Sequence, residues 1–504
     1  MTDAAELIEE NAQLKSQIKY MGAQIKQLEE LLQLFKRRQF SSSSEKASPD
    51  QIALFNEGDD DSEKESEETK TESNPLEENQ TKTHSFKKKP RVSIPKHYPR
   101  EDIIYDLPEE EKICPNDGTT LKMIGHEDHE QLDIIPAQIK VLRHRRLTYA
   151  CPCCEQHIVT ANKPKQPIPK SVASPGLLAQ IAIQKYCDAL PLYRQSQIYQ
   201  RLGIQLDRTN LANWMIRCGE LVQPLINLMR DQLQKALCVH MDETVVQVLH
   251  EAGRVAESKS YMWVMVSQGD KPVRLFHYDP TRSQSVPLSL LTPETQAIMV
   301  DGYEGYQASC DQYQITRLGC MAHARRKFID AQKLQKKGKT GKADQAIAYI
   351  QKLYCIEKKI KDLPHDERYR IRKAQSKPII DKMREWLEKS LPTVPPKTAL
   401  GKALNYLHNQ WDRLVRYLEN GSYPIDNNAA ENAVRPFVIG RKNWLFSASE
   451  SGAKSSANLY GLIETAKANQ LNIHDYLQHI FKELPNAESV EQIEKMLPWN
   501  IQLG

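Results

Sequence analysis

From Leu237 to residue 300 the hydrophobic period of the sequence changes to two, and this pattern most constrains the fold. Four runs rich in Val, Met, Ile and aromatic residues are separated by turn-forming residues: 237–249, 261–267, 273–278 and 297–300. The period predicts strands of one β-sheet. A chain of 504 residues is too long for one core, so the sheet is expected to belong to one of several domains.

Two aspartates accompany these runs, Asp242 within the first and Asp301 directly after the last. For either one alone a turn-forming role is the default interpretation, because Asp is disfavoured inside strands. Carboxylates on neighbouring strands can instead point at a common spot, where their hard oxygen atoms suit Mg²⁺ or Mn²⁺. Two such ions about 3.5–4 Å apart can serve both the attacking and the leaving oxygen of a phosphodiester.

A two-ion site needs a third carboxylate from a nearby helix. The candidate is Glu431, in the segment DNNAAENAVR. The same segment also fits a capping box, in which Asn428 and Glu431 serve only the start of the helix. The residues alone leave both interpretations open.

The N-terminal residues 7–35 place apolar side chains at alternating steps of four and three, with Asn11 as the single polar interruption. This repeat of 3.5 residues predicts a coiled coil and therefore a homo-oligomer. Asn11 occupies the position equivalent to Ile18 and Ile25, where a buried Asn favours two strands. The alternative is an amphipathic helix packed on its own domain.

An acidic and then basic linker is predicted to follow over residues 41–100. Residues 51–80 hold eleven acidic and two basic side chains and few apolar ones, so they are expected to be disordered. Because the whole chain has a net charge of +4, the remainder carries +13. That excess suggests a polyanionic partner such as nucleic acid, or a solvated surface of mixed sign.

Residues 101–165 are predicted to form a small zinc-ribbon-like module, with residues 131–147 as a strand between two knuckles. The proposed zinc ligands are Cys114, Asp117, Cys151 and Cys154. Asp117 stands where a second Cys of the first knuckle is expected, and His126 or His129 are alternative ligands. A ribbon held together by packing without metal is the other interpretation.

Residues 166–235 are predicted to be helical and to contain a helix-turn-helix. One helix ends at Gly203, and Asp207 is placed to cap the next. Three polar residues near the start of that second helix are candidates for DNA contact: Arg208, Asn210 and Asn213. A plain αα-hairpin has the same pattern.

Membrane insertion and export are not expected. The sequence has no uncharged apolar run of ~18 residues, and its N-terminus lacks the basic-then-apolar order of a signal peptide. A cytoplasmic protein is therefore predicted, associated with the nucleoid when it binds DNA.

Several segments closely resemble transposases of the insertion sequence sixty-six family, which are bacterial DDE transposases. The matching segments are HMDETVVQVL, VDGYEGYQ, GCMAHARRKF and YPIDNNAAENAVRPFVIGRKNWLFSASESG. The resemblance extends to RRQFSSSSEK, YACPCC and LIETAKANQLNIHDYL, and so covers nearly the whole chain outside the acidic linker. Family members usually have two Cys in the first knuckle, so Asp117 is a departure.

The resemblance implies a multidomain α+β protein with a ribonuclease H-like α/β catalytic core, in which Asp242, Asp301 and Glu431 bind two Mg²⁺ or Mn²⁺. The predicted parts are a coiled coil (1–40), linker (41–100), zinc-ribbon-like module (101–165), helix-turn-helix region (166–235), first core part (236–325), helical insertion (326–422) and second core part with C-terminal helices (423–504).

Basic residues near the triad are further candidates for binding DNA phosphates: Arg325, Arg326, Lys327, Arg435, Arg441 and Lys442. The basic helical insertion is expected either to follow the DNA backbone or to be a solvated bundle. Trp444 is expected either to stack on a base or to pack in the core.

The predicted function is metal-dependent cleavage at transposon ends followed by strand transfer into target DNA. The partners are the terminal repeats, the target DNA, further copies of the chain and accessory proteins of the same element. The alternative is a catalytically inactive DNA-binding protein derived from a transposase. A recombinase with a Ser or Tyr nucleophile is a further rival, but no residue is singled out for that role.

Overall fold

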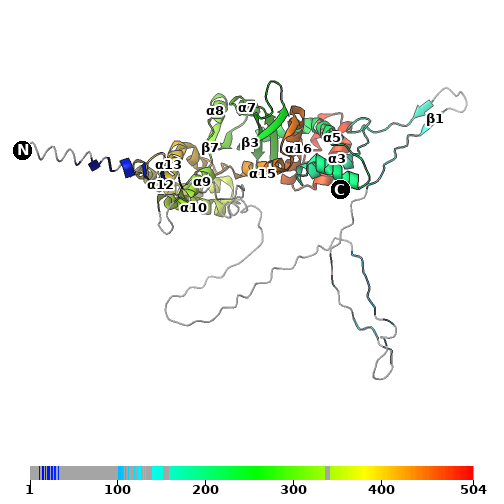
Figure 1. Ribbon diagram of the computed structural model, residues 1–504, viewed down its shortest axis with the longest axis horizontal. Helices are drawn as coiled ribbons and strands as arrows, with labels where there is room; N and C mark the ends of the chain where they lie inside the picture. Colours follow the sequence, from blue (N-terminus) through cyan, green and yellow to red (C-terminus); the bar gives the residue numbers. More distant parts are fainter. Residues whose placement is uncertain are drawn as a thin grey trace, which may run out of the picture. The chain divides into compact units, whose positions relative to one another are not determined.

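The computed structural model describes residues 139–150, 158–334 and 341–502, with scattered positions between 11 and 32 and between 100 and 131. The chain divides into two compact units, Met1–Asp60 with Arg146–Gly504, and Asp61–Arg145. The described elements of the first unit combine helices with a sheet (Figure 1). The described residues of the second unit are almost all exposed.

A six-stranded sheet lies in the first unit, in the order β5-β4-β3-β6-β7, and β8 pairs with the distal part of β3. Neighbours are antiparallel from β5 to β3 and parallel from β3 to β7. The strands are β3 (Val239–His250), β4 (Lys259–Ser267), β5 (Val273–Asp279), β6 (Ala297–Val300), β7 (Thr316–Gly319) and β8 (Ser447–Ser449). The first four confirm the strands predicted from the two-residue period.

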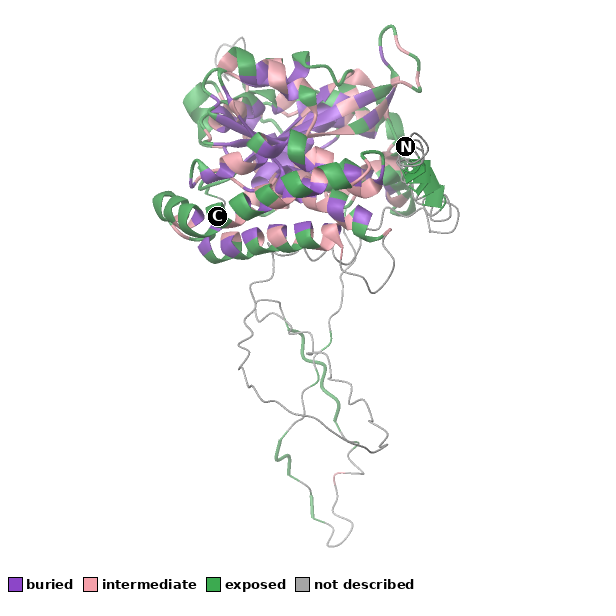
Figure 2. Cartoon of the chain, turned by 90° about the vertical axis from the view of Figure 1, so that its left-hand side faces the viewer, coloured by how far each residue is buried: buried purple, intermediate pink, exposed green. Residues whose placement is uncertain are grey.

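Helices cover the sheet, and its strands are therefore the most buried part of the unit (Figure 2). Strand β6 is buried at every position and β4 at nearly every position. Helix α15 (Asn428–Trp444) packs on β3 and β4, and α16 (Glu450–Ala468) packs on β5. This burial explains why β4 and β6 have continuous apolar runs rather than strict alternation.

Four helices precede the sheet: α3 (Pro175–Tyr186), α4 (Leu192–Arg201), α5 (Arg208–Leu221) and α6 (Gln223–Gln234). They confirm the helical character predicted there, and Gly203 follows α4 with a φ of 84°. Asp207 occupies the N-cap position of α5, but its side chain makes no capping hydrogen bond. Helices α5 and α16 cross closely at Gly219, where an added Cβ would lie 2.4 Å from Cβ of Ser455.

A separate helical bundle follows β7, with its own core built around Phe328, Ile350 and Leu404. Its helices are α9 (Met321–Gln332), α10 (Lys342–Ile360), α11 (His365–Ile371), α12 (Lys377–Ser390), α13 (Ala399–Asn409) and α14 (Trp411–Val415). They confirm that the sequence between Asp301 and Glu431 turns helical. The C-terminal helices are α17 (Ile473–Glu483), which packs on α3, and α18 (Val490–Glu494).

Around the predicted zinc module, β1 (Thr148–Ala150) pairs antiparallel with β2 (Ile158–Thr160). The strand predicted over residues 131–147 is wrong in its described part, because residues 139–147 have no regular secondary structure and are exposed. In the part of the chain that the structure describes, no residue of this segment is buried, so its alternation produces no buried face there. The proposed ligands Cys114, Asp117, Cys151 and Cys154 lie outside the described residues, as does His126.

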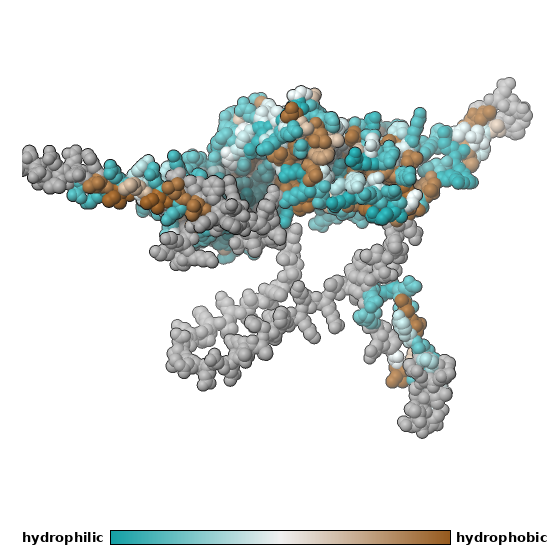
Figure 3. Space-filling view, in the orientation of Figure 1, coloured by the Kyte–Doolittle hydropathy of each residue, from teal (hydrophilic) through white to brown (hydrophobic). Residues whose placement is uncertain are grey.

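The described positions between 11 and 32 are helical. The large apolar residues on the predicted heptad seam are exposed in the single chain. Their exposed fraction runs from 49% at Leu14 to 65% at Leu28 (Figure 3). The coiled coil stays a prediction that requires a second chain. Among the described residues, no helix has both the length and the apolar character needed to cross a bilayer.

Candidate active site

Asp242 and Asp301 are brought together by the pairing of two parallel strands. Val239 of β3 pairs with Ile298 of β6, and His240 pairs with Met299. The same register places Asp242 of β3 opposite Asp301, which lies one residue beyond the end of β6. Neighbouring strands lie about 4.8 Å apart, so the two carboxyl groups start from adjacent backbones.

Local hydrogen bonds orient each aspartate. The backbone N–H of Glu243 donates to Oδ1 of Asp242 at 2.9 Å, and the N–H of Tyr303 donates to Oδ1 of Asp301 at 2.9 Å. Asp301 thus has the local turn contact typical of Asp after a strand. This contact engages one carboxylate oxygen, so a turn role and a ligand role are compatible.

Mutual repulsion of the carboxylates is visible at Asp242. Burial raises the pKa of Asp242 well above its usual value, and the negative charges of Glu243, Glu431 and Asp301 raise this pKa further. Only the hydrogen bond from the Glu243 N–H acts in the opposite direction. A divalent cation between these groups would remove the repulsion, so the residues fit such an ion.

Glu431 enters from the first turn of α15, and its side chain does not serve the helix start. The N-cap residue is Asn427 rather than Asn428, and no side chain caps the helix. Oε2 of Glu431 instead accepts from Arg326 at 2.9 Å, and Oε1 lies 3.5 Å from Nδ1 of His323. Oε1 is buried without a hydrogen-bond partner. The capping-box interpretation is therefore wrong, because the carboxylate faces α9.

Asn427, directly before α15, joins the glutamate helix to the aspartate strand. Its Nδ2 donates to the carbonyl of Met241 at 2.8 Å, so its Oδ1 accepts from Nδ1 of His240 at 3.1 Å. Its backbone N–H donates to Sγ of Cys320 at 3.2 Å. Asn427 is fully buried. These contacts fix the first turn of α15 against β3, one residue from Asp242.

Glu243 is a buried carboxylate that the sequence reasoning missed. Its side chain accepts from the Tyr306 hydroxyl at 2.6 Å and from Nε of Arg282 at 2.6 Å. Burial raises the pKa of Glu243, while the bonds from Tyr306 and Arg282 oppose that rise. Neighbouring strand residues face opposite sides of a sheet, so the alternation around Asp242 did not point to Glu243. Its adjacency to Asp242 was the available signal.

Comparison with known proteins places the chain in a family. Residues 170–455 match the model described as the Transposase IS66 family, and this match spans β3, β6 and the start of α15. The chain belongs to that family. The resemblance found in the sequence is thereby confirmed, and it supports a transposase role with DNA as partner.

Further models of this transposase family match most of the remaining chain. Residues 111–155 match a zinc-finger binding domain of transposase IS66, and residues 461–499 match an IS66 C-terminal element. Residues 27–103 match a model described as Transposase C of IS166 homeodomain. The zinc-finger match contains all four proposed zinc ligands.

Similar proteins occur in Sinorhizobium fredii (strain NBRC 101917 / NGR234). The uncharacterized protein y4jD is 29% identical over 422 residues, covering 81% of this chain and 81% of that protein. The uncharacterized protein y4qI is 29% identical over 427 residues, covering 82% of this chain and 78% of that protein. The likeness therefore extends well beyond the carboxylate site.

The basic residues predicted near the transposase site occupy different environments. Arg326 is engaged by Glu431, and the ammonium of Lys327 lies 4.6 Å from the ring centre of Tyr406. Arg441 donates to Oγ1 of Thr244 at 3.1 Å and so braces α15 against β3. The remaining three differ in exposure: Arg325 is half-buried, while Arg435 and Lys442 are exposed.

The two other predicted groups lie away from the triad carboxylates along the chain, one on α5 and one at the end of α15. Arg208, Asn210 and Asn213 are exposed at the start of α5, a helix that packs mainly on α16. Trp444 is half-buried with its ring centre 5.3 Å from that of Phe437, in an edge-on arrangement. This contact corresponds to the core alternative for Trp444 rather than to a base-stacking platform.

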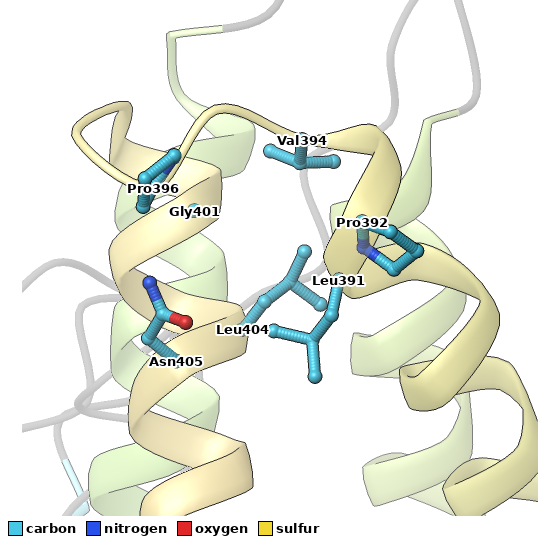
Figure 4. Close-up of a pocket in the computed structure, with 7 residues that line it drawn as sticks. All are labelled: Leu391, Pro392, Val394, Pro396, Gly401, Leu404 and Asn405. Atoms are coloured by element: carbon cyan, nitrogen blue, oxygen red, sulfur yellow. The ribbon is translucent and has the colours of Figure 1, made fainter.

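A pocket of about 270 Å³ lies in the helical bundle, at the connection between α12 and α13 (Figure 4). Its lining is mostly apolar and includes Leu391, Val394 and Leu404. No carboxylate lines it. None of the three candidate carboxylates lines the pocket.

Proposed function

We propose that this chain is a DDE transposase that cleaves DNA at transposon ends and transfers the freed strand into target DNA, with Asp242, Asp301 and Glu431 as ligands of two Mg²⁺ or Mn²⁺. One observation carries the proposal: the strand register sets Asp242 beside Asp301, and the charge of Glu431 acts on the same Asp242 carboxyl. Carboxylates whose charges act on one another are suited to hold the two metal ions of phosphodiester chemistry.

The sheet supports assignment to the ribonuclease H-like class. Three antiparallel strands, β5, β4 and β3, continue into the parallel strands β6 and β7. The two aspartates come from the centre of this sheet, where the antiparallel and parallel halves meet. The glutamate arrives from a helix that follows a long helical bundle.

The bound divalent ions would supply charge neutralisation and lower the pKa of the attacking oxygen. The residues of the chain provide the geometry. Asp242 and Asp301 offer oxygen atoms from adjacent strands, and Glu431 offers Oε1 from α15. The Arg326 guanidinium fixes the other oxygen of Glu431. Asn427 holds α15 against β3, so the glutamate cannot move independently of Asp242.

DNA binding is proposed to involve several parts of the chain. Arg435 and Lys442 are exposed on the glutamate helix and would contact phosphates near the scissile bond. Helix α5 would contact the terminal repeats through Arg208 and its neighbours. The zinc module would assist there, and the N-terminal heptads would pair two or more chains. Accessory proteins of the same element would complete the assembly.

The direct test of this function uses the purified chain and DNA carrying the element's ends. In Mg²⁺ the protein should nick or join that DNA, EDTA should stop the reaction, and Asp301→Asn should abolish it. Activity of the wild-type protein that persists in EDTA would overturn the metal mechanism. End binding without any cleavage under these conditions would identify an inactive DNA-binding relative instead.

A further inference from the structure

A cysteine, a histidine and a glutamate meet where β7 ends and α9 begins. Cys320 follows β7 and is the N-cap residue of α9, and His323 lies in the first turn of that helix. Glu431 approaches from the first turn of α15. One ligand atom from each residue lies within 4.8 Å of the other two. The cluster thus combines sulfur, nitrogen and oxygen.

Two atoms of this cluster are buried without hydrogen-bond partners, Nδ1 of His323 and Oε1 of Glu431. They lie 3.5 Å apart and face one another. Unpartnered buried polar atoms are rare because each loses its interaction with water. A cation held between a lone pair on the imidazole and the carboxylate oxygen would satisfy both atoms.

Burial raises the pKa of the Cys320 thiol, as do the charges of Asp426 and Glu431, so a thiolate here needs a cation beside it; backbone N–H groups already point at the sulfur. Sγ accepts a hydrogen bond from the backbone N–H of Asn427 at 3.2 Å, and Cys320 is fully buried. Backbone donors of this kind stabilise negative charge on a ligand sulfur and orient it. The spacing Cys-x-x-His across the start of a helix directs both side chains towards Glu431.

We propose that Cys320, His323 and Glu431 form a binding site for a thiophilic divalent cation of the zinc class. Sulfur and imidazole ligands favour Zn²⁺, whereas Mg²⁺ prefers ligands that are all oxygen. Three protein ligands leave one coordination position open, as in zinc sites that exchange ligands. Binding releases the Cys320 thiol proton to solvent. Its ligands are different residues from the cysteines within residues 111–155.

Glu431 belongs to this zinc-class site and also to the proposed Mg²⁺ or Mn²⁺ site. The expected effect on DNA cleavage rests on the proposed function. An ion held by Cys320 and His323 engages Oε1 of Glu431 and withdraws it from Asp242 and Asp301. Zinc should therefore slow DNA cleavage, and added Mg²⁺ should restore it. The side chain of His323 is 24% exposed, so the otherwise buried cluster has one edge near the surface.

The test is a Co²⁺ titration of the full-length protein, followed by the thiolate-to-cobalt absorption in the near ultraviolet. Cys320→Ser should bind about one Co²⁺ per chain fewer than wild type and lose the matching part of the absorption. The control Cys355→Ser removes an exposed thiol and should match wild type. All three proteins share the cysteines of residues 111–155, so that contribution cancels in the difference spectra.

His323→Gln is a second variant that keeps the buried thiol in place. It should weaken Co²⁺ binding at this site on the order of tenfold or more. Identical cobalt stoichiometry and spectra for wild type, Cys320→Ser and His323→Gln would overturn the site. A cobalt difference without any Mg²⁺-dependent cleavage would support the site while refuting the proposed function. Cleavage that Zn²⁺ does not slow would contradict the sharing of Glu431.

Discussion

At the scale of single residues, the site is a concentration of like charge. Asp242 lies among Glu243, Asp301 and Glu431, and its pKa is raised first by burial and then by these charges. Nearby positive charge comes from Arg282 and Arg326, each bound to a glutamate. The metal-free protein is therefore expected to be less stable than it would be without these charges, and the same charges are expected to bind a cation.

Asp242→Asn should stabilise the metal-free protein. Removing the buried charge relieves repulsion, so the free energy of unfolding in EDTA should rise by about 1–3 kcal/mol. Mg²⁺ should raise the melting temperature of wild type but not of the variant. Thermal unfolding with and without Mg²⁺ measures both effects. Asp270→Asn, in an exposed turn, is the control, and equal EDTA stabilities of all three proteins would contradict the charge argument.

His240 should make stability depend on acid pH. Burial lowers the pKa of His240 from 6.5 to about 4 in the folded chain, whereas the unfolded chain keeps the ordinary value. Between pH 6.5 and about 4 only the unfolded chain binds this proton, so stability falls as pH falls. His240→Gln should reduce that loss by up to about 3 kcal/mol.

Urea unfolding at a series of pH values measures this loss. His408→Gln, at an exposed histidine of α13, should retain the wild-type slope. An unchanged slope in His240→Gln would mean that the imidazole is not buried in its neutral form.

At the scale of elements, the site depends on how α15 is seated on β3. Asn427 supplies the connection, through its bonds to the Met241 carbonyl and the His240 ring. Arg441 adds a second contact near the other end of α15, to Thr244. The relative position of Asp242 and Glu431 is therefore set by side-chain contacts between elements distant in sequence.

Asn427→Ala should uncouple the helix from the strand. The Met241 carbonyl and His240 Nδ1 would lose buried partners, which should lower the free energy of unfolding by about 2–4 kcal/mol. Cleavage should fall strongly while binding of end DNA persists. The control Asn443→Ala removes one exposed hydrogen bond to the Ala189 carbonyl and should change stability by less than about 1 kcal/mol. Wild-type cleavage by Asn427→Ala would contradict this role.

The sequence patterns predicted the strands and helices more accurately than the side-chain contacts between them. The two-residue period located β3 to β6, and the family motifs singled out the three carboxylates. Whether Glu431 caps its own helix depended on its contacts with α9. Because α9 lies about a hundred residues earlier, no local sequence pattern records these contacts. Asn427 was missed for the same reason, whereas Glu243 was missed because it follows Asp242 in a strand and alternation assigns it to the other face. The strand predicted over residues 131–147 is wrong over 139–147, because alternation requires a surface to pack on.

At the scale of the whole molecule, the N-terminal heptads predict that the chain forms an oligomer. The seam positions Ile18 and Ile25 are 64% and 59% exposed in the single chain. Apolar side chains repeated at this spacing are expected to pair with another copy. The chain is accordingly expected to act on DNA as an oligomer.

Ile18→Asp combined with Ile25→Asp should break that oligomer, because both charges would fall in the apolar seam. Sedimentation analysis should show a shift to monomer, with the metal-dependent stabilisation of the catalytic unit retained. Tyr20→Asp, at a heptad position outside the seam, should keep the oligomer. A double variant with the wild-type sedimentation profile would place the association elsewhere.

The central claim is that the strand-borne carboxylates are themselves metal ligands, and exchanging oxygen for sulfur at Asp301 tests it most directly. Asp301→Cys should lose DNA cleavage in Mg²⁺ and regain part of it in Mn²⁺, which accepts sulfur more readily. Asp270→Cys should cleave normally with either ion. Wild-type cleavage by Asp301→Cys in Mg²⁺, or an equal loss with both ions in a folded variant, would contradict the account.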